Sequence, residues 1–149
     1  MIVNRQRLAR IPRRSLELFL RRLQAELKLG ETGVTVSFVS DAEIARMNRV
    51  FRGKRGPTDV LSFPAKSRRK PRLHRAGSAS RRADGYAGDI AISTAAARRN
   101  AAEFGRAFPT ELRILILHGV LHLVGYDHET DQGQMERAER KLRRRLGLH

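Results

Sequence analysis

The segment from Leu117 to His128 constrains this chain more than any other, because it combines an apolar helical pattern with three of the five histidines. His118, His122 and His128 follow the spacing H-x-x-x-H-x-x-G-x-x-H. Residues four apart lie one turn apart on the same face of a helix, so the first two imidazoles can reach one ion together. Gly125 can adopt a left-handed conformation that ends the helix and returns His128 as a third ligand.

This histidine pattern predicts a zinc site of the catalytic kind. Three neutral imidazoles suit zinc, and three protein ligands leave the fourth tetrahedral position to water. The alternative is that the histidines are ordinary core residues, but an unpaired buried polar group costs about 1–3 kcal/mol. The chain contains no cysteine, so imidazole must do any metal binding of this kind.

The residue after the first histidine limits the chemistry that such a metal would support. The spacing matches the zinc peptidase pattern H-E-x-x-H-x-x-G-x-x-H, in which the Glu is the general base. Here Gly119 stands at that position. The pattern therefore predicts a metal that lowers the pKa of a bound water to about 7, or polarises a phosphoryl or carbonyl oxygen, without that base.

The charge balance indicates a polyanionic partner. The chain has 31 Lys and Arg against 15 Asp and Glu, a formal net charge of +16, and nucleic acid is the first partner that such a balance suggests. The alternative is a proteome in which basic surfaces are common. A length of 149 residues suits one domain with a real core, residues 1–149, and is too short for two.

Residues 66–82 form the densest run of like charge, with eight Lys or Arg and no acidic residue. Such a run cannot bury a core, so we expect a flexible basic insertion. Two interpretations remain open: an electrostatic arm that contacts a nucleic acid backbone, or a solvated loop.

The apolar segments are too short for the membrane. The longest runs from Leu112 to Val124 and contains Arg113, whereas a membrane span needs ~20 apolar residues. The N-terminal residues carry arginines and no apolar run of signal-peptide length. We therefore expect a soluble, cytoplasmic protein.

Hydrophobic periodicity predicts alternating strands and helices. Ser40 and Glu43 form a capping box, residues 48–57 are expected to form a basic loop, and Thr110 is the expected cap of the histidine helix. That helix is apolar on nearly every side, which predicts a central, buried element. Strands are expected at 2–3, 34–39, 58–63 and 86–93, and helices at about 12–29, from 40, at 94–105, from 108 and at 131–146.

Four motifs together resemble one known family. They are Met47-Asn-Arg-Val-Phe-Arg-Gly-Lys54, Pro57-Thr-Asp-Val-Leu-Ser-Phe-Pro64, Gly88-Asp-Ile90 and the histidine motif that ends at His128. In this order they resemble the bacterial YbeY endoribonucleases, which process ribosomal RNA. The resemblance covers the chain from about Met47 to His128. The basic stretch 66–82 departs from it, because a short connection is expected there.

The resemblance implies a fold, a cofactor and partners. The fold would be a single mixed α/β (α+β) domain related to zinc peptidases, zincin-like, with an about four-stranded mixed sheet and helices packed around the buried HxxxH helix. One Zn²⁺ per chain would be held by His118, His122 and His128. The partners would be single-stranded ribosomal RNA, the ribosomal small subunit and an Era-type GTPase, with no membrane partner.

The functional hypothesis is a zinc-dependent, single-strand-specific endoribonuclease that matures the 3′ end of small-subunit ribosomal RNA and acts in ribosome quality control. Zinc on His118 and His122 would polarise a phosphate oxygen or present hydroxide. Arg52, which the resemblance also implicates in activity, would neutralise developing charge through its planar fork. Lys54 and Arg55 would position the RNA backbone. The nucleophile, zinc-bound water or the ribose 2′-hydroxyl, is left open.

Other assignments stay open at this point. Asp127 would either orient His128 from outside the metal's direct ligands or simply form a turn, and Asp59 and Asp89 are expected to hold strand ends or loops. Two other functions compete with the nuclease hypothesis. One is a ribosome-assembly factor with a structural zinc that binds RNA without cutting it, and the other is a zinc peptidase, which Gly119 and the net charge disfavour.

Overall fold

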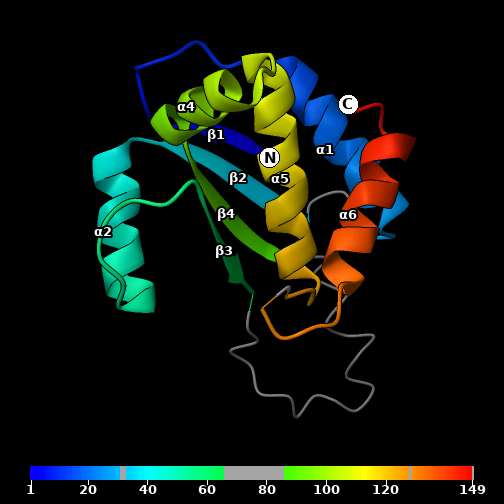
Figure 1. Cartoon of the computed structure of the whole chain (residues 1–149). Coiled ribbons are helices and arrows are strands. Elements are labelled where there is room, and N and C mark those ends of the chain that lie inside the picture. Colours follow the sequence, from blue (N-terminus) through cyan, green and yellow to red (C-terminus); the bar gives the residue numbers. More distant parts are fainter. Residues whose placement is uncertain (31–32, 66–85, 128, 149) are drawn as a thin grey trace.

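A computed structural model describes residues 1–30, 33–65, 86–127 and 129–148. Its centre is a four-stranded mixed sheet of strand order β1-β2-β4-β3 (Figure 1). β1, β2 and β4 are parallel, and β3 pairs antiparallel with β4 at the edge of the sheet. The prediction of a single mixed α+β domain with four strands is therefore confirmed. The strands are β1 (Ile2–Asn4), β2 (Val34–Val39), β3 (Val60–Pro64) and β4 (Gly88–Ser93).

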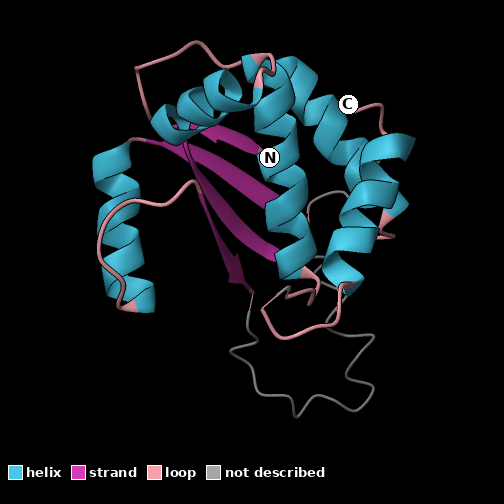
Figure 2. Cartoon of the chain, viewed as in Figure 1, coloured by secondary structure: helices cyan, strands magenta, loops and turns pink. Residues whose placement is uncertain are grey.

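Helices cover both faces of this sheet (Figure 2). Side chains alternate along β4, so Ile90 and Ile92 join the main core, whereas Ala91 joins a smaller cluster on the opposite face. α1, α5 and α6 pack on the main core, and α2 covers the smaller cluster through Ile44. The described helices are α1 (Arg13–Glu26), α2 (Asp41–Arg52), α4 (Thr94–Phe104), α5 (Phe108–Leu123) and α6 (Gln134–Arg145).

α5 is the helix around which the main core is built. Its residues are buried on nearly every side, as the sequence predicts for a helix without a polar face. It packs on β3 and β4 and against α1, α4 and α6, and Figure 1 shows it between the sheet and α6. Among the described helices, none combines the length and the apolar character that a membrane span requires.

Several boundaries differ by a few residues from the sequence prediction, and two of these differences concern α2 and α5. α2 continues to Arg52, so residues 48–52 are helical rather than part of a loop, and Gly53 ends the helix with a φ of 67°. α5 begins at Phe108, with Ala107 as the N-cap and Thr110 inside the helix, because Pro109 suits the first turn. Ser40 is the N-cap of α2, since its hydroxyl accepts from the Glu43 N–H at 3.1 Å, whereas the Glu43 carboxylate pairs with Arg5 at 2.6 Å. The predicted insertion at 66–82 lies outside the described residues.

Candidate metal centre and RNA-binding surface

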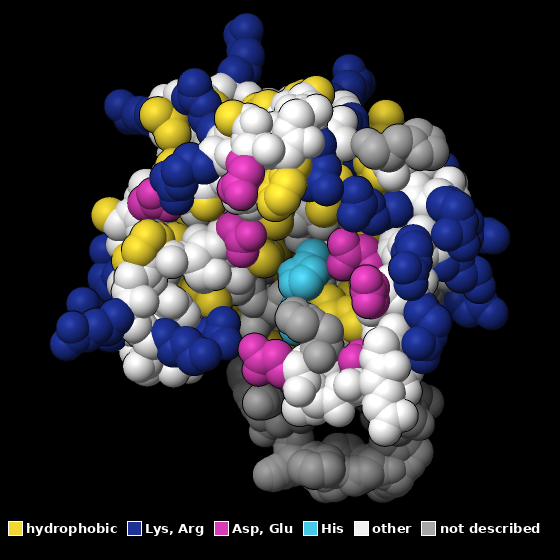
Figure 3. Space-filling model, in the orientation of Figure 1, with side chains coloured by type: hydrophobic (Ala, Val, Ile, Leu, Met, Phe, Trp, Pro, Cys, Tyr) yellow, Lys and Arg dark blue, Asp and Glu magenta, His cyan; other side chains and the backbone are white. Residues whose placement is uncertain are grey.

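His118 and His122 are partly exposed positions in the mostly buried C-terminal half of α5. From Ile114 to Leu121 every residue except His118 is buried, and His122 follows as a half-buried residue. Their ring centroids lie 4.9 Å apart at an interplanar angle of 72°. The spacing of four residues thus brings the two imidazoles together, as predicted. Figure 3 shows a histidine in a hollow of the surface, with acidic side chains beside it.

The end of α5 turns the chain as the glycine predicts. Val124 is the C-cap of α5, and Gly125 follows it with a φ of 107°. Such a positive φ favours glycine. The Tyr126 N–H donates to the Leu121 carbonyl at 3.0 Å, which closes the helix end. The third predicted ligand, His128, lies outside the described residues, so its placement as a ligand stays a prediction.

Glu139 on α6 faces His118 and was not found from the sequence. Its Oε1 lies 3.3 Å from His118 Nδ1, and Arg143 Nη1 lies 3.7 Å from its Oε2. A carboxylate only accepts hydrogen bonds, so this contact places the imidazole proton on Nδ1 and leaves Nε2 as the acceptor or ligand atom. A signal was present in the sequence, because Glu139 stands between Met135 and Leu142 at the spacing of the buried stripe, where an apolar residue is expected.

Gly119 lets α5 approach the sheet closely. A Cβ at this position would lie 2.9 Å from Ile90 Cγ2 and 3.0 Å from its Cδ1. The Ser62 hydroxyl on the edge strand β3 donates to the Gly119 carbonyl at 2.9 Å. A side chain here would therefore point into β4, which explains why the position cannot hold a catalytic glutamate without moving the helix.

The donor set fits part of a zinc site. Within the described ranges, no group of three or more His, Cys, Asp and Glu side chains is arranged to hold a metal. Two imidazoles stand together, and a carboxylate orients one of them, which is the usual arrangement around a zinc-binding histidine. His118 and His122 would supply two ligands, and the three-histidine set with His128 stays a prediction.

The three basic residues predicted to bind RNA lie apart from the histidine pair. Arg52 ends α2, and Lys54 and Arg55 follow it, all three exposed. α2 packs on the face of the sheet opposite α5, so the structure does not bring these residues together with the histidines. The side chain of buried Asn48 donates to the Gly56 carbonyl at 3.0 Å and holds the loop that carries Lys54 and Arg55 against the helix.

The aspartates of the motifs have local partners. Oδ1 of exposed Asp127 accepts from the Glu129 N–H at 3.1 Å, which is the turn role that the sequence left open. Asp59 accepts from the Asn100 amide at 3.2 Å, and Asp89 accepts from the Tyr86 hydroxyl at 2.5 Å. These contacts hold loops and strand ends, as expected for Asp59 and Asp89.

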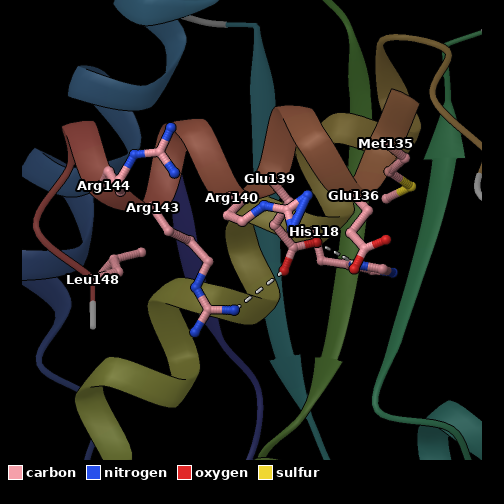
Figure 4. Close-up of a pocket in the computed structure, with 8 residues that line it drawn as sticks. All are labelled: His118, Met135, Glu136, Glu139, Arg140, Arg143, Arg144 and Leu148. Atoms are coloured by element: carbon pink, nitrogen blue, oxygen red, sulfur yellow. Dashed lines mark hydrogen bonds and ion pairs between the residues drawn. The ribbon is translucent and has the colours of Figure 1, made fainter. Parts of the chain in front are cut away.

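A cavity of about 510 Å³ lies beside His118. Residues of α6 form most of its wall, and Leu148 closes the far end (Figure 4). The wall is mixed in charge, since it contains Glu136 and Glu139 as well as arginines. The arginines that line it are Arg140, Arg143 and Arg144.

The comparison with known proteins identifies the family. The family model described as "Endoribonuclease YbeY" matches residues 1–147. The chain belongs to the YbeY endoribonuclease family. The resemblance that the four motifs suggested is therefore confirmed, and with it an RNA-cutting family.

Curated YbeY relatives match almost the whole chain. An "Endoribonuclease YbeY" from Koribacter versatilis is 46% identical, over 99% of this chain and 86% of the relative. Another from Solibacter usitatus is 44% identical, over 94% of this chain and 83% of the relative. A solution structure from Thermotoga maritima has a TM-score of 0.60 and 29% identity, and it covers 98% of this chain and 89% of that one. The mixed α+β fold is thus shared with a solved structure.

Proposed function

We propose that this YbeY family member is a zinc-dependent endoribonuclease that cuts single-stranded ribosomal RNA, in 3′ end maturation of the small-subunit RNA and in ribosome quality control. The observation that carries the proposal is the pair of half-buried imidazoles, 4.9 Å apart, in the C-terminal half of α5, where the residues from Ile114 to Leu121 other than His118 are buried. Two accessible histidines among buried neighbours are expected of a metal-binding site, because a histidine that only fills the core would itself be buried and hydrogen-bonded. The ribosomal small subunit and an Era-type GTPase are proposed partners on the family resemblance alone.

Each residue of the proposed site would have a separate role in RNA cleavage. His118, His122 and His128 would hold the metal, with Glu139 fixing the proton of His118 on Nδ1. A bound zinc would supply Lewis acidity at the scissile phosphate. Arg52 would neutralise the charge that develops on the phosphate, and its guanidinium suits that geometry.

The sheet edge offers a route between the two groups. β3 is the edge strand, and its alternating side chains face α5 through Ser62 and α2 through Leu61 and Phe63. The loop after α2 leads into β3, and Figure 1 shows the ends of α2 and α5 that carry Arg52 and His122 at the same end of the molecule. An extended RNA strand that crosses this edge would contact both groups.

The decisive experiment is cleavage of a 5′-labelled single-stranded RNA that carries the 3′ end of small-subunit ribosomal RNA. The native protein is compared with a His118→Ala/His122→Ala variant purified in parallel, because a basic protein can carry contaminating ribonucleases. Zinc content is measured on both preparations. We expect the native protein to contain zinc and cut the RNA, and the variant to do neither.

Two other outcomes would overturn the proposal. Equal cleavage by both proteins would assign the activity to a contaminant. RNA binding without cleavage by the native protein would favour an assembly factor. The ends of the product identify the nucleophile, since a 2′,3′-cyclic phosphate excludes direct attack by water.

A further inference from the structure

The cavity between α5 and α6 carries three arginines beside its two glutamates, and it lies next to the histidines. Its volume, about 510 Å³, falls within the range of small-molecule sites. One wall is His118 on α5, and the other carries Arg140 and Arg144 on α6. The pocket is thus contiguous with the proposed catalytic site but lies on the side of α5 away from the sheet (Figures 1 and 4).

The arginines of this pocket differ in the partners they already have. Arg143 lies 3.7 Å from Glu139. Arg145, on the same helix, pairs with Glu26 outside the pocket at 2.7 Å. Arg140 and Arg144, by contrast, form no salt bridge with any residue of the described ranges, and both are exposed. A spacing of four places their guanidinium groups on one face of α6.

We propose that this pocket is a subsite for RNA phosphate groups, with Arg140 and Arg144 binding the backbone of the nucleotides on one side of the scissile bond. The inference rests on the proposed function, because it takes the histidines as the cleavage point. The guanidinium fork matches phosphate oxygens in geometry and stays charged at every physiological pH. Lys54 and Arg55 would then contact the strand on the other side of the histidines.

The structure also provides a matched control on the same helix. Arg137 and Lys141 are exposed residues of α6 that do not line the pocket. An Arg137→Ala/Lys141→Ala variant removes two positive charges, as Arg140→Ala/Arg144→Ala does. Both variants replace good helix formers by alanine, so α6 should be retained in each. Circular dichroism and thermal unfolding check that both remain folded.

The experiment measures binding without cleavage. The probe is a fluorescent, 2′-O-methyl single-stranded RNA of the small-subunit 3′ end, and the titration contains a chelator. We expect the Arg140→Ala/Arg144→Ala variant to bind about tenfold or more weakly than the native protein, as two charged hydrogen bonds allow. The slope of log affinity against log salt should fall by roughly 0.7 for each lost phosphate contact. The control variant should lose clearly less on both measures.

The outcomes separate this inference from the proposed function. If the two variants lose affinity and slope equally, or neither loses any, or the native protein does not bind the probe, the pocket is not a phosphate subsite and the inference is overturned. If the native protein fails to cut RNA but the pocket variant alone binds weakly, the nuclease proposal fails while the RNA subsite stands. If the native protein cuts RNA and both variants bind it identically, the nuclease proposal stands while the subsite fails.

Discussion

Nδ1 of His118 lies 3.3 Å from Oε1 of Glu139, and that carboxylate in turn faces Arg143 at 3.7 Å. The contact joins α5 to α6 across 21 residues of sequence. A carboxylate held in this way fixes both the ring orientation and the proton position of the imidazole. The geometry therefore makes Glu139 a positioning residue for His118 in the proposed metal site.

Replacing this carboxylate should weaken metal binding. We expect Glu139→Gln to lower zinc affinity by about 10–100-fold, the usual effect of losing the partner of a metal-binding histidine. Affinity is measured by competition with a chromophoric chelator, which needs no RNA cleavage. The matched control is Glu136→Gln, which removes a carboxylate from the same pocket wall. Equal losses in both variants would mean that pocket charge, and not the bond to His118, sets the affinity.

Close packing at Gly119 predicts a specific stability effect. A Cβ at this position would lie 2.9 Å from Ile90 Cγ2, so Gly119→Ala should lower the free energy of unfolding by about 1–3 kcal/mol through overpacking. Urea unfolding measures the change. In an Ile90→Ala background the space is open, and the same substitution should be neutral or stabilising because alanine favours the helix. A loss of equal size in both backgrounds would show that the close approach to Ile90 is not its cause.

The histidine helix could be predicted from sequence because its signals are local. The helical period places His118 and His122 on one face, and the turn depends on a single residue, Gly125, whose φ is indeed 107°. Such features need only the order of neighbouring residues. The four motifs indicated the YbeY family, which the composition alone did not indicate.

Features that depend on how distant elements pack could not be derived in the same way. The spacing of Glu139 on the buried stripe marks it as unusual, but its partner, His118, becomes known only when α6 docks on α5. The loop was expected to begin at Asn48, yet this side chain is buried and its amide binds the Gly56 carbonyl, which requires the helix to continue past it. Arg52 ends a helix that packs on the face of the sheet opposite α5, and this follows from how the helices pack on the two core clusters, which no local pattern contains.

The guanidinium of Arg52, and not only its charge, should matter for cleavage. Under the proposed function, Arg52→Lys keeps the charge but loses the planar fork, so we expect the single-turnover cleavage rate to fall by about 10²-fold, comparable to the loss of one transition-state donor. RNA affinity should change little. The control is Arg49→Lys, in the same last turn of α2 and also exposed. Full activity of Arg52→Lys would show that only the positive charge of this residue matters for cleavage, and not its guanidinium geometry.

Asp41 should make stability depend on acid pH. A hydrogen bond from the Ser93 hydroxyl at 2.6 Å and the Arg99 guanidinium at 3.1 Å hold the pKa of this carboxyl below its ordinary value of 3.8, against the opposing effect of burial. A lowered pKa in the folded state stabilises the protein above the unfolded value, and this contribution is lost as pH falls through the folded pKa. Urea unfolding from about pH 7 to pH 3 should therefore show an advantage of the native chain over Asp41→Asn that shrinks in acid.

A second variant tests the cause of that pH dependence. The Ser93 hydroxyl also caps α4 by accepting from the Ala96 N–H at 3.0 Å, so Ser93→Ala should lower the free energy of unfolding by about 1 kcal/mol at every pH through loss of the cap. The Ser93 hydrogen bond is also the largest cause of the lowered pKa of Asp41. The pH-dependent advantage of Asp41 over the Asp41→Asn substitution should therefore be smaller when both are measured in a Ser93→Ala background. An unchanged pH dependence there would assign the effect to Arg99, and Arg99→Gln would then abolish it.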